Sequence, residues 1–115
     1  MANTFKVITK AGVTSLDLIY TVASSTTTVV LGIILGNTTT TQKTAPVTLT
    51  SDTANRAGAN NEANQAVELV TNAPIPAGSS LEMLAGNKVV LETTDTISVT
   101  ATGATDVALS IMEIT

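Results

Sequence analysis

Hydrophobic and polar residues alternate along most of this chain in short runs, with the period of two that is typical of β-strands. The pattern predicts strands at residues 5–9, 16–22, 29–35, 47–50, 66–70, 81–84, 88–92, 97–100 and 107–114. Gly, Pro, Asn and Asp separate these runs at the spacing of a sandwich or a barrel. No run of 10 to 15 residues carries a helical stripe, which argues against parallel βαβ units. We therefore expect one all-β domain over residues 1–115, an antiparallel β-sandwich of about eight strands, either immunoglobulin-like or jelly-roll-like.

Three of the runs carry more detailed predictions. In the second run, one apolar face is formed by alternate residues, namely Leu16, Leu18, Tyr20 and Val22. The third run is apolar on both faces, which is typical of a central strand, and Gly32 inside it permits a bulge or close packing. The turn residues Ala85-Gly86-Asn87 predict a hairpin between runs 81–84 and 88–92. We interpret the glycines in general as turn or bulge positions.

The last run has apolar residues on both faces near its end. Val107, Leu109 and Ile111 point one way, whereas Met112 and Ile114 fall on the opposite face. Something should cover that second face. Met112 and Ile114 are therefore candidate interface residues, and they motivate the hypothesis of a homo-oligomer, with a trimer as one form.

The segment from Ser51 to Gln65 has no apolar periodicity and is rich in Asp, Asn and Ala. We expect a long exposed loop that contacts a neighbouring protein. One short helical turn and a loop that is merely solvated are the alternatives that stay open. The candidate contact residues in it are Asn55, Arg56, Asn60 and Asn61. A calcium site built from this segment, with Asp52 and Glu62 added, is disfavoured because the spacing matches no calcium-binding loop.

The composition argues against an enzyme. The chain has no His, Cys or Trp, one Phe and one Tyr, but twenty-three Thr among its 115 residues. It therefore lacks His as an acid–base group at neutral pH and Cys as a nucleophile, and neither a disulfide nor a thiolate zinc site can form. We expect Asp17, Glu68, Glu82 and Glu113 on the outward faces of strands, and Glu92 and Asp95 beside a turn, all as solvated surface. No catalytic residue, cofactor or metal is expected.

The charge pattern disfavours nucleic acid and membrane as partners. The net charge is −4, only 12% of residues are charged, and the five basic residues are scattered. No basic stripe is available for phosphates, and the aromatic residues are too few for base stacking. The longest apolar stretch, residues 29–35, is far shorter than the ~20 residues that span a bilayer. Residues 1–5 lack the features of a signal peptide, so we expect synthesis in a cytoplasm. So few charges favour a surface that is wetted by hydroxyls and amides or is buried in an assembly.

Several segments together resemble a known family. They are Leu31-Gly32-Ile33-Ile34-Leu35-Gly36-Asn37-Thr38, Pro74-Ile75-Pro76-Ala77-Gly78-Ser79-Ser80-Leu81, residues 85–92, residues 95–99 and the C-terminal residues 107–115. With these segments in this order, the chain resembles small virion structural proteins of tailed bacteriophages, including those of marine phages and cyanophages. The resemblance implies a non-enzymatic component of a viral particle with an antiparallel β-sandwich. It implies other virion proteins, major capsid or tail proteins, as partners, the virion as location and the cytoplasm of a host bacterium as the place of synthesis.

Within that class we expect a capsid decoration or cement protein. Two alternatives stay open. One is a component of the tail, neck or fibre, and the other is a module that binds host-surface carbohydrate. A sugar platform normally uses exposed aromatic rings, and the only aromatic residues are Phe5 and Tyr20, of which Tyr20 is patterned inward. The sequon at Asn37-Thr38-Thr39 is a weak signal for glycosylation.

Overall fold

The computed structural model describes residues 2–52, 62–83 and 88–115. These residues form β-strands and connecting segments without an α-helix. The strands are β1 (Asn3–Val13), β2 (Leu16–Thr21), β3 (Thr27–Asn37), β4 (Lys43–Thr44), β5 (Val47–Thr50), β6 (Ala66–Val70), β7 (Pro74–Ile75), β8 (Ser80–Met83), β9 (Val89–Leu91), β10 (Thr96–Thr100) and β11 (Thr105–Ile114).

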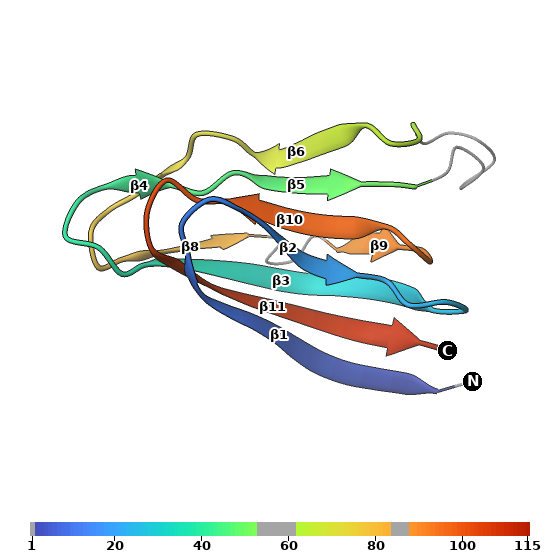
Figure 1. Cartoon of the computed structure of the whole chain (residues 1–115). Helices are drawn as coiled ribbons and strands as arrows, with labels where there is room; N and C mark the ends of the chain where they lie inside the picture. Colours follow the sequence, from blue (N-terminus) through green and yellow to red (C-terminus); the bar gives the residue numbers. More distant parts are fainter. Residues whose placement is uncertain (1, 53–61, 84–87) are drawn as a thin grey trace.

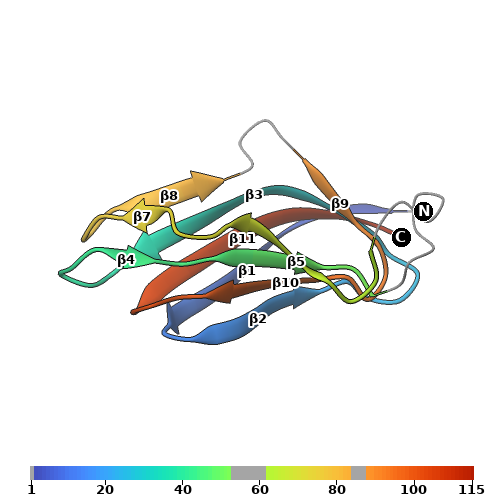
Figure 2. The ribbon, with the colours of Figure 1, turned by 90° about the horizontal axis from the view of Figure 1, so that it is seen from above.

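Two sheets face one another in two layers (Figure 1). Sheet A has the order β1-β11-β3-β8, with β9 also paired to β3, and sheet B has the order β2-β10-β5-β6. A short ribbon of β4 and β7 lies at one end of the sandwich (Figure 2). The named strands pair antiparallel in each sheet. The expected all-β antiparallel sandwich is therefore confirmed.

The core lies between the two sheets and comes from alternate residues of the central strands. Ile33 of β3 pairs with Leu109 of β11 in sheet A, and both side chains are buried. Ile97 of β10 faces them from sheet B. The side chains that are almost completely buried are Val22, Thr28, Val30, Ile33, Leu35, Val47, Ile75, Leu91, Ile97, Val99, Leu109 and Ile111. Aliphatic side chains of moderate size fill a two-layer core in place of aromatic rings.

The predicted apolar face of the second strand is only half correct. Tyr20 and Val22 are buried, but Leu16 and Leu18 are 69% and 55% exposed. The pairing of β2 with β10 shifts between Leu18 and Tyr20, so that Ile19 is an extra residue in the ladder. A bulge of this kind moves the residues on its two sides to opposite faces of the sheet. Leu16 and Leu18 thus lie outside the core, whereas Ile19 is buried.

The predicted hairpin between runs 81–84 and 88–92 is wrong. β8 pairs with the Ile33–Gly36 part of β3, and β9 pairs with its Thr28–Val30 part. Both pairings are antiparallel to the same strand, so β8 and β9 run in the same direction, one after the other along one edge. β3 has 11 residues, enough to hold both short strands in line. The turn residues 85–87 lie outside the described residues.

The glycine predictions are confirmed at Gly32 and Gly78 and wrong at Gly36. The register of β3 with β11 shifts between Val30 and Gly32, which confirms the predicted bulge. Gly78 has a φ of 69°, as expected for the turn after Pro76. Gly36, however, lies inside β3, which continues to Asn37, so it is neither a turn nor a bulge. Neither Gly32 nor Gly36 has a positive φ.

The segment expected to be a long loop is described only at its two ends. Ser51 forms an isolated bridge with Ala63, and the Asn64 N–H donates to the Ser51 carbonyl at 2.7 Å. These contacts close the connection between β5 and β6 next to the sheet. Asn55, Arg56, Asn60 and Asn61 lie outside the described residues, so their role as contact residues stays a prediction.

Candidate interaction surface

A buried polar cluster joins the two sheets near the termini and corrects one expectation. Glu113 of β11 points into the sandwich rather than to solvent, and its side chain is only 13% exposed. The Tyr20 hydroxyl donates to Glu113 Oε2 at 2.6 Å, and Lys6 Nζ lies 2.6 Å from Glu113 Oε1. Because that hydroxyl has one proton, the 2.8 Å contact with Thr28 has Thr28 Oγ1 as its donor.

The contacts of this cluster shift two pKa values. The hydrogen bonds from Lys6 and Tyr20 hold the pKa of Glu113 below its ordinary value. Burial, reinforced by the neighbouring Glu113 carboxylate, raises the pKa of Tyr20 to about 12. Each group is therefore held in its resting state, the carboxylate charged and the phenol neutral. The charged carboxylate accepts a hydrogen bond from the neutral tyrosine hydroxyl, and this contact links β2 to β11. It does not make either group a poised acid or base.

Asp95 is a second carboxylate that is buried against expectation. Its Oδ2 accepts from the Glu92 N–H at 3.0 Å and its Oδ1 accepts from the Asp52 N–H at 3.2 Å. The acceptors of Asp95 thus hold the turn before β10 against the segment after β5. Glu68, Glu82 and Glu92 are exposed, as predicted. Asp17 is half-exposed, but it is paired with the buried Val99, so it lies on the core-side face of the edge strand β2 and not on the outward face that was expected.

Asn37 cannot serve as a glycosylation acceptor in this fold, because its side chain is buried. Its Nδ2 donates to the carbonyl oxygens of Thr41 at 2.8 Å and Ile75 at 2.9 Å. Its Oδ1 accepts from the Thr39 N–H at 2.9 Å. The side chain ties the end of β3 to β7 and to the following turn, so the Asn37-Thr38-Thr39 sequence serves the fold.

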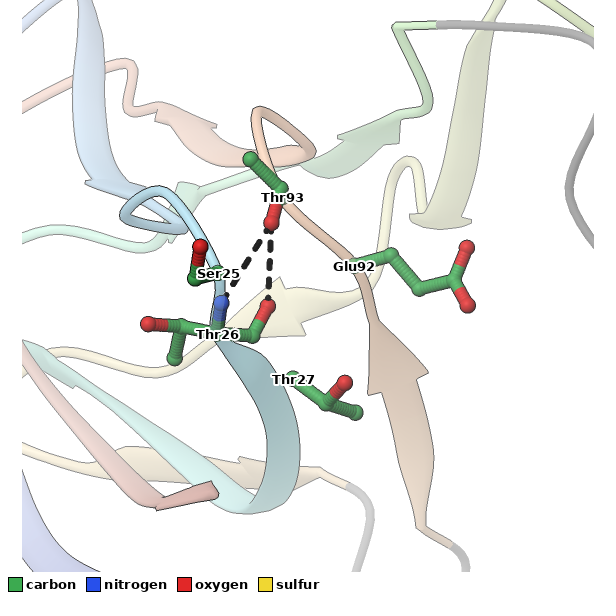
Figure 3. A pocket seen from close by; sticks show the side chains of 5 residues that line it. All are labelled: Ser25, Thr26, Thr27, Glu92 and Thr93. Atoms are coloured by element: carbon green, nitrogen blue, oxygen red, sulfur yellow. Dashed lines mark hydrogen bonds between the residues drawn. The ribbon is translucent and has the colours of Figure 1, made fainter. Parts of the chain in front are cut away.

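One open pocket of about 310 Å³ is lined by Ser25, Thr26, Thr27, Glu92 and Thr93 (Figure 3). Thr93 Oγ1 donates to the Thr26 carbonyl at 3.3 Å and accepts from the Thr26 N–H at 3.4 Å, which ties the two turns together. The Glu92 carboxylate extends away from Ser25 and Thr26 in Figure 3. The lining offers hydroxyls and one carboxylate, with no imidazole or thiol to activate them. No step of catalysis follows from this geometry.

The outer face of sheet A is the surface feature with the strongest physical signature. One row of side chains crosses its strands: Phe5 is paired with Met112, Met112 with Val29, and Val29 with Val90. Paired residues share a face of the sheet, and these are opposite in direction to the inward Ile111 and Glu113. Phe5 is 70% and Val90 62% exposed. We call this row of Phe5, Met112, Val29 and Val90 the apolar ridge.

The next row on the same face begins with Val7 of β1, which is 60% exposed and paired with Ser110, and is low only beyond it. Ser110 is paired with Gly32 there, and the pair forms what we call the trough. An open hollow of about 320 Å³ lies over Gly32 and extends to Ile34 and Glu82. A second hollow of about 350 Å³ lies beyond Ile34, over Gly36 and Ala108. The face is thus a ridge beside a depression, not a flat plane.

The outer face of sheet B is rich in hydroxyls, although Leu16 and Leu18 of β2 also lie on it. Thr48 is paired with Ser98, and their hydroxyl oxygens lie 2.6 Å apart. Thr50 is paired with Thr96 in the next outward row. This face is wetted by hydroxyls, as the composition led us to expect for the surface in general. Of the large apolar residues that are exposed, Phe5, Val7, Ile34 and Val90 lie on sheet A, and Leu16, Leu18 and Val67 lie on sheet B.

The sequence-based site residues are placed as follows. Met112 and Ile114 do lie on the face opposite Ile111, and both are half-buried, Met112 within the apolar ridge. The structure adds Phe5 and Val90, which sequence reasoning did not assign to a site. The alternation of Phe5 and Val7 with Lys6 carried a signal for an exposed apolar edge. It was hidden because the same run reads equally well with either face inward.

Within the described residues, no helix is long and apolar enough to cross a membrane. Across residues 2–52, 62–83 and 88–115, no cluster of three or more Asp or Glu side chains is arranged to hold a metal ion.

Comparison with known proteins gives little beyond this geometry. No protein-family model matches the chain, and no curated protein matches it. Among solved structures, it is similar to a Bacillus endospore appendage protein, described as one of a novel family of disulfide-linked pili. The two are 16% identical, the match covers 97% of this chain and 84% of that chain, and the TM-score is 0.49. The sequence here contains no cysteine. The likeness is too weak to support a functional argument, which therefore depends on the residues described above.

Proposed function

We propose that this protein is a non-enzymatic structural subunit of a bacteriophage particle, most specifically a capsid decoration protein. The observation that carries the structural role is the uncovered apolar ridge of sheet A. Exposing Phe5 and Val90 to water is unfavourable by about 25 cal/mol per Å² of apolar surface, and burial in an assembly removes that cost. The phage assignment is supported by the sequence resemblance of residues 31–38 and of the segments after residue 74.

The rigidity of the sandwich suits such a role. The chain ends are tied together, because Ala2 and Thr115 exchange two backbone hydrogen bonds of 3.1 and 3.0 Å. β1 and β11 therefore form a long ladder with no loose end among the described residues. A particle subunit that acts by shape needs this kind of stiffness, since ordering a flexible segment on binding would reduce the affinity.

The test is incorporation into particles. Virions of the phage that encodes the protein are purified on a density gradient, and the protein is quantified by mass spectrometry against the major capsid protein. A fixed stoichiometric ratio supports the proposal, and absence from the particle fraction contradicts it. Particles that lack the protein are then incubated with purified wild type, with Val90→Glu and with the control Leu18→Glu, and sedimented. We expect Val90→Glu to bind more weakly, because it charges the ridge, and Leu18→Glu to bind like wild type.

A location in the tail, neck or fibre is the alternative within the same class. Electron microscopy of antibody-labelled particles separates the two: label over the capsid faces supports decoration, and label on the tail contradicts it. The carbohydrate-binding alternative is weakened by the geometry, because Tyr20 is buried and Phe5 is the one exposed aromatic side chain. Binding of the protein to a glycan array would reopen it.

A further inference from the structure

We infer that Lys6 and Lys10 block the free edge of strand β1, so that no strand of another molecule extends sheet A there. A blocked edge goes beyond the proposed function, because it does not depend on the particle to which the protein belongs. It concerns the two edge strands that contact one another on one side of the sandwich, β1 of sheet A and β2 of sheet B (Figure 2).

β1 is the edge that most needs protection. It has 11 residues, and among the described strands it pairs with β11 alone, so its other side presents unpaired backbone groups. Phe5 and Val7 are exposed on its outer face. A long edge strand with exposed apolar side chains is a template for pairing between molecules.

The register places both lysines on the core-side face of this edge. Lys6 is paired with Ile111 and Lys10 with Val107, and both partners are buried. Paired residues share a face of the sheet, so the two lysine side chains leave β1 toward the space between the sheets. They are nevertheless 48% and 45% exposed, because β1 is the last strand of its sheet. That contact with water depends on nothing lying beside β1.

Two carboxylates hold the lysines in this position. Lys6 Nζ lies 2.6 Å from Glu113 Oε1, and Lys10 Nζ lies 3.7 Å from Oδ1 of the inward-facing Asp17 on β2. These four are the charged residues that face inward from the described strands of sheets A and B. The others, Glu68, Glu82 and Asp106, face outward. The inward charges are therefore gathered on the β1–β2 side of the sandwich.

The opposite side of the sandwich shows the contrast. Its edge strands β6, β8 and β9 carry no inward charge among the described residues, but they have only 5, 4 and 3 residues. A very short edge strand offers few backbone groups to a partner, so it needs no further protection. Charge thus faces inward where the edge is long and is absent where the edge is short.

A strand added beside β1 would take away the water around both ammonium groups. Removing a charged group from water costs more than an ion pair returns unless its remaining hydrogen bonds are also replaced. Pairing of two copies adds repulsion, because full antiparallel overlap of Asn3–Val13 sets Lys6 of one copy opposite Lys10 of the other. Parallel pairing in register sets each lysine opposite its own counterpart. Like charges in directly opposite positions are destabilising in both arrangements.

Stability of the fold does not explain Lys10. Its contact with Asp17 is long, and the two side chains are 45% and 38% exposed. Ion pairs of this kind contribute little to the free energy of unfolding. A β-branched residue fits a core-side position of a strand better than lysine does. A charged residue that faces inward from an edge strand instead prevents pairing between edges.

The experiment measures self-association of the full chain by sedimentation over a concentration series. Lys10→Val should associate at least about tenfold more strongly than wild type, because it removes an ammonium group that pairing would dehydrate. It does so although the variant is more negatively charged. A triple variant, Lys10→Val with Lys6→Met and Glu113→Gln, removes both lysines without leaving a charged Glu113 unpaired, and should show a larger increase.

Two control variants separate the blocked edge from a general effect of charge. Lys10→Arg keeps a positive charge at the edge and should behave like wild type. Lys88→Val removes a lysine from an exposed position outside the strands and should also behave like wild type. Circular dichroism and thermal unfolding check that each variant is folded, and Lys10→Val decides the question if the triple variant is not.

Hydrogen exchange identifies the surface through which the variants associate. Pairing through the edge must slow exchange of the β1 backbone N–H groups that point away from β11, whereas packing through a face leaves them fast. A folded Lys10→Val variant that associates no more strongly than wild type would overturn the inference. Association that leaves the β1 N–H groups fast, or an equal increase in Lys88→Val, would overturn it as well.

Discussion

Glu113 shows how one side chain can decide the relation between two sheets. It lies on β11, yet its two carboxylate oxygens are held by Lys6 of β1 and Tyr20 of β2. The chain has few other charges with which to make such a joint. The charge state of this one group should therefore be visible in the stability of the whole protein.

The first prediction concerns acid. The pKa of Glu113 is lowered in the folded state, so on acidification the unfolded chain takes up this proton before the folded chain does. The contribution of ionised Glu113 to the free energy of unfolding is therefore fully present above pH 4.5 and is lost as the pH falls through the depressed pKa. Urea unfolding between about pH 3 and about pH 7, the range in which carboxylates titrate, measures this contribution to the free energy of unfolding. Glu113→Gln should be less stable at neutral pH by about 1–3 kcal/mol and should lose this part of the acid dependence.

The control for that prediction is Glu68→Gln. Glu68 is exposed on the edge strand β6 and accepts one hydrogen bond, from Thr71, at 2.8 Å. Its stability curve should follow that of wild type across the same pH range. Equal acid dependence in Glu113→Gln and in wild type would contradict the prediction.

The second prediction concerns Asn37. Asn37→Asp replaces an amide donor with a carboxylate that would face the carbonyl oxygens of Thr41 and Ile75. We expect a loss of at least about 2 kcal/mol, since buried groups are left without donors. Thermal unfolding measures the change, with the exposed Asn72→Asp as the matched control. A melting temperature equal to that of the control would refute this role of the Asn37 side chain.

At the scale of elements, bulges decide which residues face the core. In β2 the bulge at Ile19 turns Leu16 and Leu18 outward, and in β3 the bulge at Leu31 keeps Val30 and Ile33 both inward. β1 has a similar irregularity between Lys10 and Val13, where Gly12 has a φ of 65°. Each bulge shifts the alternation by one position. A pattern read without the bulges therefore assigns half of such a strand to the wrong face.

The third prediction contrasts two glycines at this scale. Gly12→Ala should lower the free energy of unfolding by about 1 kcal/mol, because a Cβ is strained at positive φ even in open space. Gly36→Ala should raise it by about 0.5–1 kcal/mol, because β3 is extended there and a Cβ has room. Chemical denaturation of the two variants gives both values. Opposite signs are expected, and equal effects would contradict the account of the β3 glycines.

At the scale of the whole molecule, stability rests on one aliphatic layer between two unequal outer surfaces. Sheet B presents hydroxyls to water, and sheet A presents the apolar ridge. With few aromatic residues, the core depends on close packing of Ile, Leu and Val side chains. Removing volume at its centre should therefore be felt by the whole protein.

The fourth prediction tests this dependence. Leu109 is completely buried at the centre of sheet A, and Leu109→Ala should cost about 2–5 kcal/mol through the cavity it leaves. Leu16→Ala removes the same atoms at an exposed position and should change stability by less than about 0.5 kcal/mol. Thermal and urea unfolding compare the two. Comparable losses would mean that the core does not lie where the structure places it.

The alternation of residues determined much by itself: the all-β class, the approximate strand positions, the inward side of Val107, Leu109 and Ile111, and the outward side of Met112 and Ile114. These follow from local periodicity, which two neighbouring residues already express. Tertiary structure alone decided that β8 and β9 share an edge of β3, that Glu113 is turned inward, and that Phe5 and Val90 join Met112 in one ridge. Those features depend on register between strands far apart in the chain, and register is set by packing and bulges rather than by any local pattern.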